Sequence, residues 1–368
     1  MHVLLTANSA WNIFNFRRPI VEALQSAGYR VSVLAPKDDA APLLIEMGCD
    51  FYDLKMDLKG TNPLNDYLLK KRYQRIFKSL SPDVVLSYTI KNNLFGALAA
   101  KSLGIPFIPN VTGLGTAFLS SGLLQRIAEG LYKRAFSGLP VVFFQNEDDK
   151  SLFLERRLVS ARQARLLPGS GIDLDRFPAS DIPAEALPMT FLMIARLLKD
   201  KGVFEYVEAA RFVKQRFPDV RFEILGAIGS ANRTAIGFST VDKWIEEGVI
   251  EYLGTTNDVR PAIEAATCVV LPSYREGAPR TLIEAAAMGR PLIATDVPGC
   301  RAVLDDEVSG FLCTVRDSQS LAAAFERFID LTPEERAKMG SASREKMERE
   351  FDQKIVVAAY QNALSSFV

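Results

Sequence analysis

Histidine is almost absent from this chain: His2 is the only one among 368 residues, and it stands at the start of the first expected strand. A mechanism that depends on an imidazole base is therefore disfavoured. Cysteine is also scarce, at positions 49, 268, 300 and 313, and no two of the four form a C-x-x-C pair. The sequence thus indicates neither a zinc site nor a disulfide framework, and free thiols fit a reducing compartment.

Long apolar runs are missing as well, because no run reaches the roughly 18 residues that a transmembrane helix needs. Residues 1–5 enter an apolar strand directly, without the basic and long apolar regions of a signal peptide. No glycine occurs between Asn8 and Asn15, where a dinucleotide-binding oxidoreductase would carry G-x-G-x-x-G after its first strand. We therefore expect a cytoplasmic protein that is not an oxidoreductase of this kind.

Charge is balanced over the whole chain but not between its halves. Residues 1–180 carry 22 Lys and Arg against 16 Asp and Glu, and residues 181–368 carry 22 against 28. This asymmetry indicates either an anionic partner for the first half or chance scatter over two solvated surfaces. We expect no nucleic-acid partner, and the sequence does not indicate an oligomeric state.

Short apolar runs alternate with longer amphipathic stretches in both halves, which predicts an α/β protein built from parallel βαβ units. Strands are expected at 3–7, 30–35, 51–53, 84–87, 107–110, 141–145, 191–195, 221–225, 250–253, 268–271, 291–294 and 310–313. Helices are expected at 19–27, 40–47, 63–80, 92–103, 123–136, 202–216, 258–265, 280–288, 318–330 and 333–349.

The segment from Pro168 to Pro188, rich in proline, glycine and acidic residues, interrupts this rhythm as a linker would. We expect a Rossmann-like domain at 1–172, a second one at 173–348, and a C-terminal helix in 349–368 that packs back on the first domain. Ligands of such sheets bind at the carboxyl ends of the strands, so the two parallel sheets are expected to face each other across a cleft.

The loop at 272–277 follows an expected strand and leads into a helix that begins near Arg280. A helix N-terminus offers unpaired N–H groups to a diphosphate, and Gly277 allows a ligand to approach the backbone closely. Glu276 precedes this helix and Glu284 lies inside it, and their carboxylates can accept hydrogen bonds from sugar and ribose hydroxyls. Alternatively, Glu276 is a surface acid and Glu284 is an acid favoured by the helix dipole.

A second group, Arg196 and Lys201, lies in the loop between the strand expected at 191–195 and the helix expected at 202–216. A rigid guanidinium and a lysine at this place can neutralise two phosphates. The alternative is a pair of solvated cations in an ordinary loop.

Together these segments resemble the retaining GT-B glycosyltransferases of family four, and the resemblance covers essentially the whole chain. It is carried by Ala195-Arg196 with Lys201-Gly202, Pro272-Ser273 with Glu276-Gly277 and Pro279, Glu284-Ala285, Gly289 with Pro291, residues 295–301 and residues 168–173. At Ser170 family members more often carry asparagine.

The resemblance implies a catalytic set of Arg196, Lys201 and Glu276. The two cations would contact the donor diphosphate, Glu276 a hydroxyl of the donor sugar and Glu284 the ribose, with Leu253 near the base. The donor-binding set that it implies comprises Leu253, Gly277, Ala278, Pro279, Arg280, Thr281, Leu282 and Glu284.

The N-terminal domain is expected to bind the acceptor. Residues 8–19 take the place of a cleft-lining loop and resemble the Phe-Arg-x-Pro version in transferases that act on undecaprenyl-diphosphate-linked sugars. Arg17 there either contacts an acceptor diphosphate or is an exposed cation at the start of a helix. The polar segments 87–93 and 110–116 resemble acceptor loops of the same subgroup. The expected acceptor set is Asn15, Arg17, Lys91, Asn92, Thr112, Gly113, Gly115 and Thr116.

Two amphipathic stretches, 63–80 and 117–136, combine cations with apolar residues. Each favours either contact with a membrane surface or a stripe that faces the core beneath a solvated back. The expected location is therefore the cytoplasmic face of the inner membrane, as a peripheral protein.

The resemblance implies a retaining, metal-independent hexosyltransferase that needs no cofactor besides the UDP-sugar. It favours transfer of an N-acetylhexosamine, such as GalNAc, to a polyprenyl-diphosphate-linked saccharide in surface polysaccharide or glycan assembly. We see no carboxylate nucleophile and no D-x-D motif in a suitable loop, so front-face displacement is the expected mechanism. A UDP-sugar epimerase of the same architecture and a non-enzymatic two-domain sugar-binding protein are the alternatives.

Overall fold

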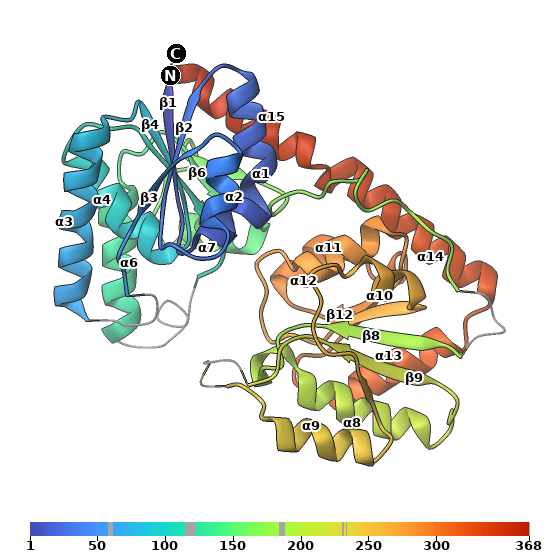
Figure 1. The fold of residues 1–368 in the computed structure, drawn as a ribbon. Helices are drawn as coiled ribbons and strands as arrows, with labels where there is room; N and C mark the ends of the chain where they lie inside the picture. Colours follow the sequence, from blue (N-terminus) through green and yellow to red (C-terminus); the bar gives the residue numbers. More distant parts are fainter. Residues whose placement is uncertain (58–61, 115–122, 184–187, 230–231, 233, 368) are drawn as a thin grey trace. The chain divides into compact units, whose positions relative to one another are not determined.

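The structure is a computed structural model that describes residues 1–57, 62–114, 123–183, 188–229, 232 and 234–367. The chain divides into two compact units (Figure 1). The first comprises Met1–Gly171 together with Gln353–Val368, and the second comprises Ile172–Asp352. Within the described residues, no helix is both long enough and apolar enough to cross a membrane.

The first unit contains a parallel sheet of seven described strands in the order β3-β2-β1-β4-β5-β6-β7. The strands are β1 (His2–Thr6), β2 (Arg30–Ala35), β3 (Asp50–Asp53), β4 (Val84–Tyr88), β5 (Phe107–Val111), β6 (Val142–Phe144) and β7 (Ala164–Leu166). Side chains alternate between its two faces: Leu4 and Val85 join one buried cluster, whereas Val3 and Val84 join the other. Both faces are therefore covered, as in parallel sheets generally.

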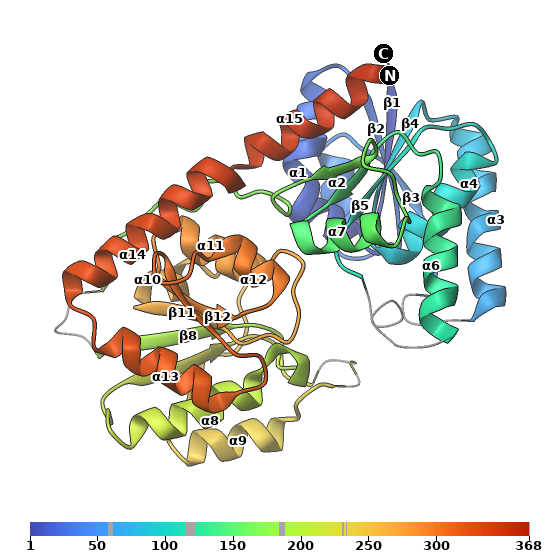
Figure 2. The same cartoon turned by 180° about the vertical axis from the view of Figure 1, so that it is seen from behind.

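The helices of the first unit lie on these two faces. One face carries α1 (Ala10–Ser26), α2 (Ala41–Glu46) and α15 (Gln353–Leu364), and the other carries α3 (Pro63–Leu80), α4 (Ala97–Lys101), α6 (Leu123–Phe136) and α7 (Glu147–Glu155) (Figures 1 and 2). A π-helical turn, Asn92–Gly96, precedes α4. The prediction of one α-helix at 92–103 is therefore wrong for residues 92–96, which are π-helical.

The loop expected at residues 8–19 is also wrong, because α1 begins at Ala10 and contains Pro19. Ser9 caps this helix by accepting a hydrogen bond from the backbone N–H of Asn12 at 3.1 Å. Buried residues then recur at helical spacing from Ile13 onwards. Burial of this stripe stabilises the helix despite the carbonyl that Pro19 leaves without an N–H partner.

The second unit contains a parallel sheet of six described strands in the order β10-β9-β8-β11-β12-β13. The strands are β8 (Thr190–Ile194), β9 (Arg221–Leu225), β10 (Glu251–Tyr252), β11 (Cys268–Leu271), β12 (Leu292–Thr295) and β13 (Gly310–Cys313). Its helices are α8 (Val203–Lys214), α9 (Phe238–Glu246), α10 (Arg260–Ala265), α11 (Arg280–Ala287), α12 (Pro298–Val303), α13 (Ser318–Ile329) and α14 (Pro333–Lys346). The parallel α/β organisation predicted for both halves is confirmed.

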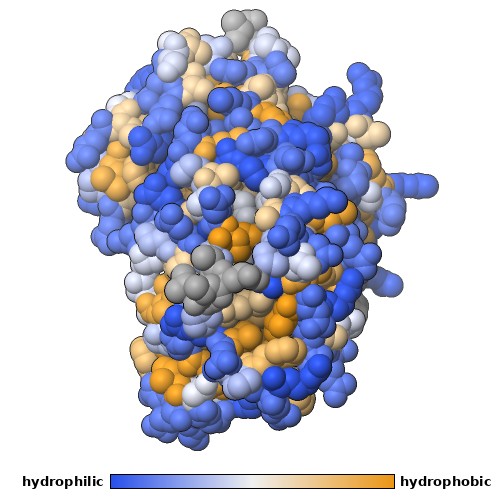
Figure 3. Space-filling view, turned by 90° about the vertical axis from the view of Figure 1, so that its right-hand side faces the viewer, coloured by the Kyte–Doolittle hydropathy of each residue, from blue (hydrophilic) through white to orange (hydrophobic). Residues whose placement is uncertain are grey.

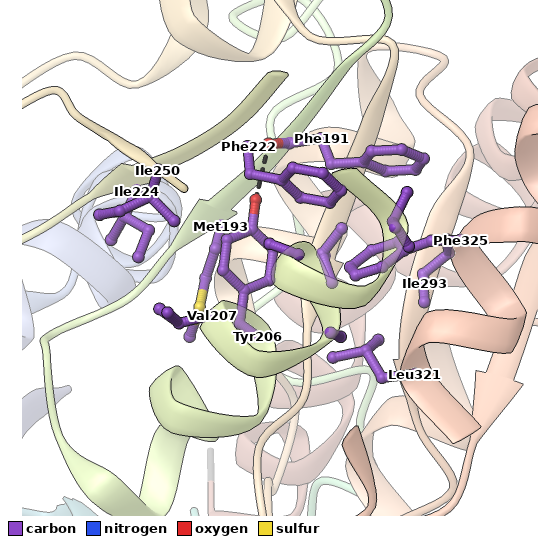
Figure 4. Packing of buried hydrophobic residues seen from close by; sticks show 14 of the residues in the cluster. Phe191, Met193, Tyr206, Val207, Phe222, Ile224, Ile250, Ile293, Leu321 and Phe325 are labelled. Carbon is purple, nitrogen blue, oxygen red and sulfur yellow. Dashed lines mark hydrogen bonds between the residues drawn. The ribbon is translucent and has the colours of Figure 1, made fainter. Parts of the chain in front are cut away.

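Aromatic rings fill the core beneath α8 and α13 in the second unit. Phe191 and Phe222 stack with their ring centroids 5.4 Å apart, and Phe325 lies against both (Figure 4). The hydroxyl of Tyr206 donates a hydrogen bond to the carbonyl of Phe191 at 2.7 Å, so this buried polar atom is satisfied. The surface seen in Figure 3 carries mainly hydrophilic side chains, with apolar ones in smaller patches between them.

Arg290 fastens the segment that precedes β8 to the second unit. Its guanidinium is fully buried and donates to the carbonyls of Ser180, Asp181 and Ile263 at 2.8, 2.9 and 2.9 Å. Burial lowers the pKa of Arg290 to about 10, which leaves the side chain charged at neutral pH. Part of the stretch expected as a linker, at Ser180 and Asp181, is therefore held in place by hydrogen bonds from Arg290.

Candidate active site

The loop at 272–279 lies at the carboxyl end of β11, the edge at which parallel sheets bind ligands. Ser273 is fully buried, and its carbonyl accepts a hydrogen bond from Thr295 of the neighbouring strand β12 at 2.5 Å. Pro279 precedes α11, and among the described residues no side chain caps this helix. The N-terminus of α11 therefore presents its N–H groups without a side-chain cap, as an anion site requires.

Two glycines allow other segments to approach this loop closely. Gly202 adopts φ +74°, and a Cβ there would lie 2.0 Å from the carbonyl oxygen of Pro272. A Cβ at Gly299, in α12, would lie 2.6 Å from the carbonyl oxygen of Glu276. Any larger residue at either position would displace the loop backbone, so both glycines shape the site.

The structure brings together residues that are 75 positions apart in the sequence: the Lys201 ammonium donates to the Glu276 carboxylate. The side chains of this ion pair are 25% and 13% exposed, so it is largely shielded from solvent. Arg280, the first residue of α11, pairs through Nε with Oε1 of Glu284, one turn further along the helix, at 2.8 Å. Glu276 and Glu284, the two carboxylates expected to bind the donor sugar and the ribose, thus each pair with a cation of the expected donor site.

Arg196 and Leu253 follow strands of the same sheet. Arg196 lies two residues beyond the end of β8 and is exposed, and it makes no ion pair within the described part of the chain. Leu253 follows the edge strand β10, is 42% exposed, and donates its backbone N–H to Ile224 at 2.9 Å. The remaining donor residues, Gly277, Ala278, Pro279, Thr281 and Leu282, belong to the loop or to the first turn of α11.

Tyr274 is a residue of this loop that the sequence did not single out. Its hydroxyl donates to Glu205 of α8 at 2.7 Å, and the Arg316 guanidinium lies 4.6 Å from the centre of its ring. Burial and the hydrogen bond to Glu205 raise the pKa of Tyr274, so the phenol stays neutral. Tyr274 therefore anchors the loop to α8. In the sequence, only its position two residues before Glu276 indicated such a role.

The first unit contains a pocket of about 310 Å³ at the carboxyl ends of β1, β4 and β5. It is lined by Asn8, Met56, Thr89, Ile90, Lys91, Asn92, Thr112 and Gly113. Four of the expected acceptor residues, Lys91, Asn92, Thr112 and Gly113, therefore meet at one place. Gly115 and Thr116 lie outside the described residues.

Asn92 supports this pocket from beneath. It is fully buried, and its amide donates to the Tyr73 hydroxyl at 2.8 Å and to Thr6 Oγ1 at 3.1 Å. Its Oδ1 accepts from Thr89 Oγ1 at 2.8 Å, and Thr89 adopts φ +72°, which is uncommon for a residue other than glycine. The side chain of Asn92 is thus committed to holding the pocket wall.

Arg17 and Asn15 are not among the residues that line this pocket. Asn15 is exposed on α1, whereas Arg17 is only 3% exposed and lies 4.3 Å from the centre of the Tyr88 ring. The alternative of an exposed cation at a helix start is therefore wrong for Arg17. Its Nε and Nη1 are buried without hydrogen-bond partners within the described residues.

Known proteins match the chain in both halves. The family Glycosyl transferase 4-like matches residues 2–146, and the family Glycosyl transferases group 1 matches residues 182–346. One relative is the N,N'-diacetylbacillosaminyl-diphospho-undecaprenol alpha-1,3-N-acetylgalactosaminyltransferase of Campylobacter jejuni. It is 25% identical to this chain, and the match covers 98% of this chain and 97% of the relative. The UDP-Gal:alpha-D-GlcNAc-diphosphoundecaprenol alpha-1,3-galactosyltransferase of Escherichia coli is 26% identical over 80% of the chain and 76% of its own length.

Solved structures agree on the fold. A glycosyltransferase from Rickettsia africae superposes with a TM-score of 0.80 at 18% identity, covering 100% of this chain and 98% of its own. Anabaena HepE, solved in complex with UDP, gives a TM-score of 0.78 at 18% identity and covers 100% of both chains. These matches give no support to the epimerase or sugar-binding alternatives. The chain belongs to the glycosyltransferases, as an enzyme of the GT-B class with a glycosyl transferase 4-like domain followed by a group 1 domain.

Proposed function

We propose that this glycosyltransferase moves a sugar, most readily an N-acetylhexosamine, from a UDP-sugar to a polyprenyl-diphosphate-linked saccharide with retention of configuration. The observation that carries the proposal is the pairing of Lys201 with Glu276 and of Arg280 with Glu284 at the uncapped start of α11. Such a site offers cations to a diphosphate and carboxylates to hydroxyls within one unit.

The donor roles follow from these chemical types. Arg196, Lys201 and the start of α11 bind the diphosphate, and they stabilise the charge that develops on it as the sugar departs. Glu284 accepts hydrogen bonds from the ribose, and Glu276 accepts one from the donor sugar. UDP is the proposed nucleotide because a curated relative is named as using UDP-Gal and HepE was solved with UDP.

Front-face displacement is the proposed mechanism. The bond between the acceptor oxygen and the sugar C1 forms on the face from which the bond to the diphosphate oxygen breaks. The proton of the acceptor hydroxyl passes to that departing oxygen, so no protein base is needed. The one histidine fits this proposal, because His2 opens β1 at the amino end of the sheet, where it contacts Ser32 at 2.7 Å.

The acceptor side of the proposal rests on the first unit, whereas the second unit binds the donor. Lipid-linked acceptors are proposed because both curated relatives are named for diphospho-undecaprenol substrates. The core-facing stripe weighed for 63–80 is present in α3 as Leu69, Tyr73 and Phe77. The first turns of α3 nevertheless expose Leu64, Tyr67 and Leu68, which are 64%, 54% and 41% exposed.

These exposed residues, followed by cations along α3, support peripheral binding to an anionic membrane surface, which we place at the cytoplasmic face of the inner membrane. Ile127 of α6, 58% exposed, adds a further apolar contact. Flotation with vesicles containing anionic lipid tests this part. Leu64→Ser with Leu68→Ser should reduce binding, whereas Ile45→Ser, a change at a 57% exposed residue of α2, should not. Equal flotation of both variants would contradict the docking proposal.

The transfer assay uses purified protein, a panel of UDP-sugars, and a saccharide on a short polyprenyl diphosphate. Nucleotide release is measured with and without acceptor, and the anomeric configuration of the product is read by NMR. We expect release that depends on the acceptor and a product of unchanged configuration. Consumption of UDP-sugar without an acceptor would favour the epimerase, an inverted product would overturn retention, and release from GDP- or ADP-sugars only would overturn the choice of UDP.

A further inference from the structure

Lys91, in the wall of the pocket of the first unit, forms an ion pair that joins two separate elements. Lys91 Nζ lies 3.0 Å from Asp66 Oδ1, and the side chains are 17% and 20% exposed. Asp66 belongs to the first turn of α3 and is the only acidic residue in that helix, among several cations. Lys91 lies in the pocket wall next to the π-helical turn. A helix rich in lysine and arginine thus contributes its one carboxylate to a lysine of the pocket wall.

This pairing decides which ligand charge the pocket suits. An unpaired lysine would attract an anion, but the carboxylate beside Lys91 cancels its charge and would repel a phosphate. The ammonium has three N–H donors and needs one for Asp66, while the carboxylate keeps lone pairs for further donors. With Asn8, Thr89 and Thr112, and with Met56 and Ile90 as apolar wall, the pocket offers donors and acceptors without net charge.

We propose that this pocket binds the neutral terminal sugar of the acceptor and that Asp66 is a positioning residue, which holds Lys91 toward that sugar. The inference rests on the proposed function and deepens it, since it separates the acceptor sugar from the acceptor diphosphate. The volume of about 310 Å³ is near the lower end for small-molecule sites and suits one sugar ring. The wall is rigid, because Thr89 and Asn92 are bonded to each other and Asn92 is bonded to Tyr73.

The experiment measures steady-state transfer to two acceptors that carry the same saccharide. One bears a short polyprenyl diphosphate and the other a neutral octyl group. Asp66→Asn keeps the size of the side chain and removes its charge, and Asp66→Glu keeps the charge. Glu22→Gln is the matched control, because it removes the acid of an exposed pair in the same unit, Arg18–Glu22 at 2.7 Å.

For Asp66→Asn we expect the acceptor KM to rise about tenfold, or ~1.4 kcal/mol, on both acceptors. The kcat and the donor KM should stay within about twofold of wild type, as they should for Glu22→Gln throughout. Asp66→Glu should restore most of the acceptor KM. In a Lys91→Met background, Asp66→Asn should add little, because the two residues act as one unit.

An unchanged acceptor KM would overturn the proposal. A rise confined to the diphosphate-linked acceptor would also overturn it, since the pocket would then hold the diphosphate. Parallel changes in kcat and donor KM, with a lowered melting temperature, would show that Asp66 only fastens α3. Failure of the wild type to transfer to either acceptor would instead count against the proposed function itself.

Discussion

Glu276→Gln should make the protein bind free UDP more tightly while it loses transfer. Without a donor, the Lys201 ammonium is held by the Glu276 carboxylate, and a diphosphate must take this lysine away from it. Two unit charges about 4 Å apart at an effective dielectric near 20 attract by ~4 kcal/mol. Partial exposure of 25% and 13% and the entropy of both side chains reduce the net value to ~1 kcal/mol. Glutamine keeps the shape and removes this competitor.

The expected gain is therefore about fivefold to tenfold in UDP affinity, measured by isothermal titration calorimetry. Transfer should fall about 100-fold, because the donor sugar loses a hydrogen bond to a charged group. Glu284→Gln is the matched control: it also removes an acid paired with a cation, but this acid is proposed to hold the ribose, so UDP affinity should fall. If Glu276→Gln bound UDP equally or more weakly with an unchanged melting temperature, the competition described here would be refuted.

The other predictions concern stability and loop geometry. Arg290→Met should lower the free energy of unfolding by ~3–5 kcal/mol, since the buried carbonyl of Ile263 and the partly buried carbonyls of Ser180 and Asp181 lose their donor, and urea titration would show it. Burial, and to a smaller extent the positive charge of Arg30, lower the pKa of His2 below 6.5. Because the unfolded chain then binds more protons than the folded one, the free energy of unfolding should fall as the pH drops from 6.5 toward the pKa of the folded state. Gly202→Ala should abolish nucleotide binding in calorimetry, whereas Gly28→Ala, with no atom within 4 Å of its Cβ, should strain only its own turn.

Each of these has an outcome that contradicts it. A loss below about 1 kcal/mol for Arg290→Met would mean that water satisfies the carbonyls. The pH dependence should disappear in His2→Gln, and its persistence there would assign it to other groups. Normal UDP binding by Gly202→Ala would show that the loop beside Pro272 tolerates displacement.

The sequence predicted the parallel α/β architecture because apolar runs of strand length and amphipathic stretches of helix length recur in both halves. It also indicated the donor loop, because Glu276 and Gly277 stand between a strand and a helix. It did not predict the pairing of Lys201 with Glu276 or of Asp66 with Lys91, since such pairs depend on which strands lie side by side. The glycosyltransferase assignment is confirmed, whereas the roles of individual residues stay predictions.

Short elements were missed for a related reason. Helix α12 has 6 residues and β7 has 3, too few to establish a period. Helix α1 was placed about nine residues late because Pro19 was taken as its start, although the capping Ser9 marks the true beginning. Arg17 was misjudged as a consequence, because within the helix its position falls on the buried face.

The composition of the first unit has a consequence for biosynthesis. Its core includes Val356, Tyr360 and Leu364 of α15, which leave the ribosome after the whole second unit. Domains generally fold as units during synthesis, so residues 172–352 can complete their core while the N-terminal sheet still lacks one of its covering helices. The unit whose synthesis begins first is thus finished last, and until α15 has emerged from the ribosome it exposes the apolar face that α15 covers.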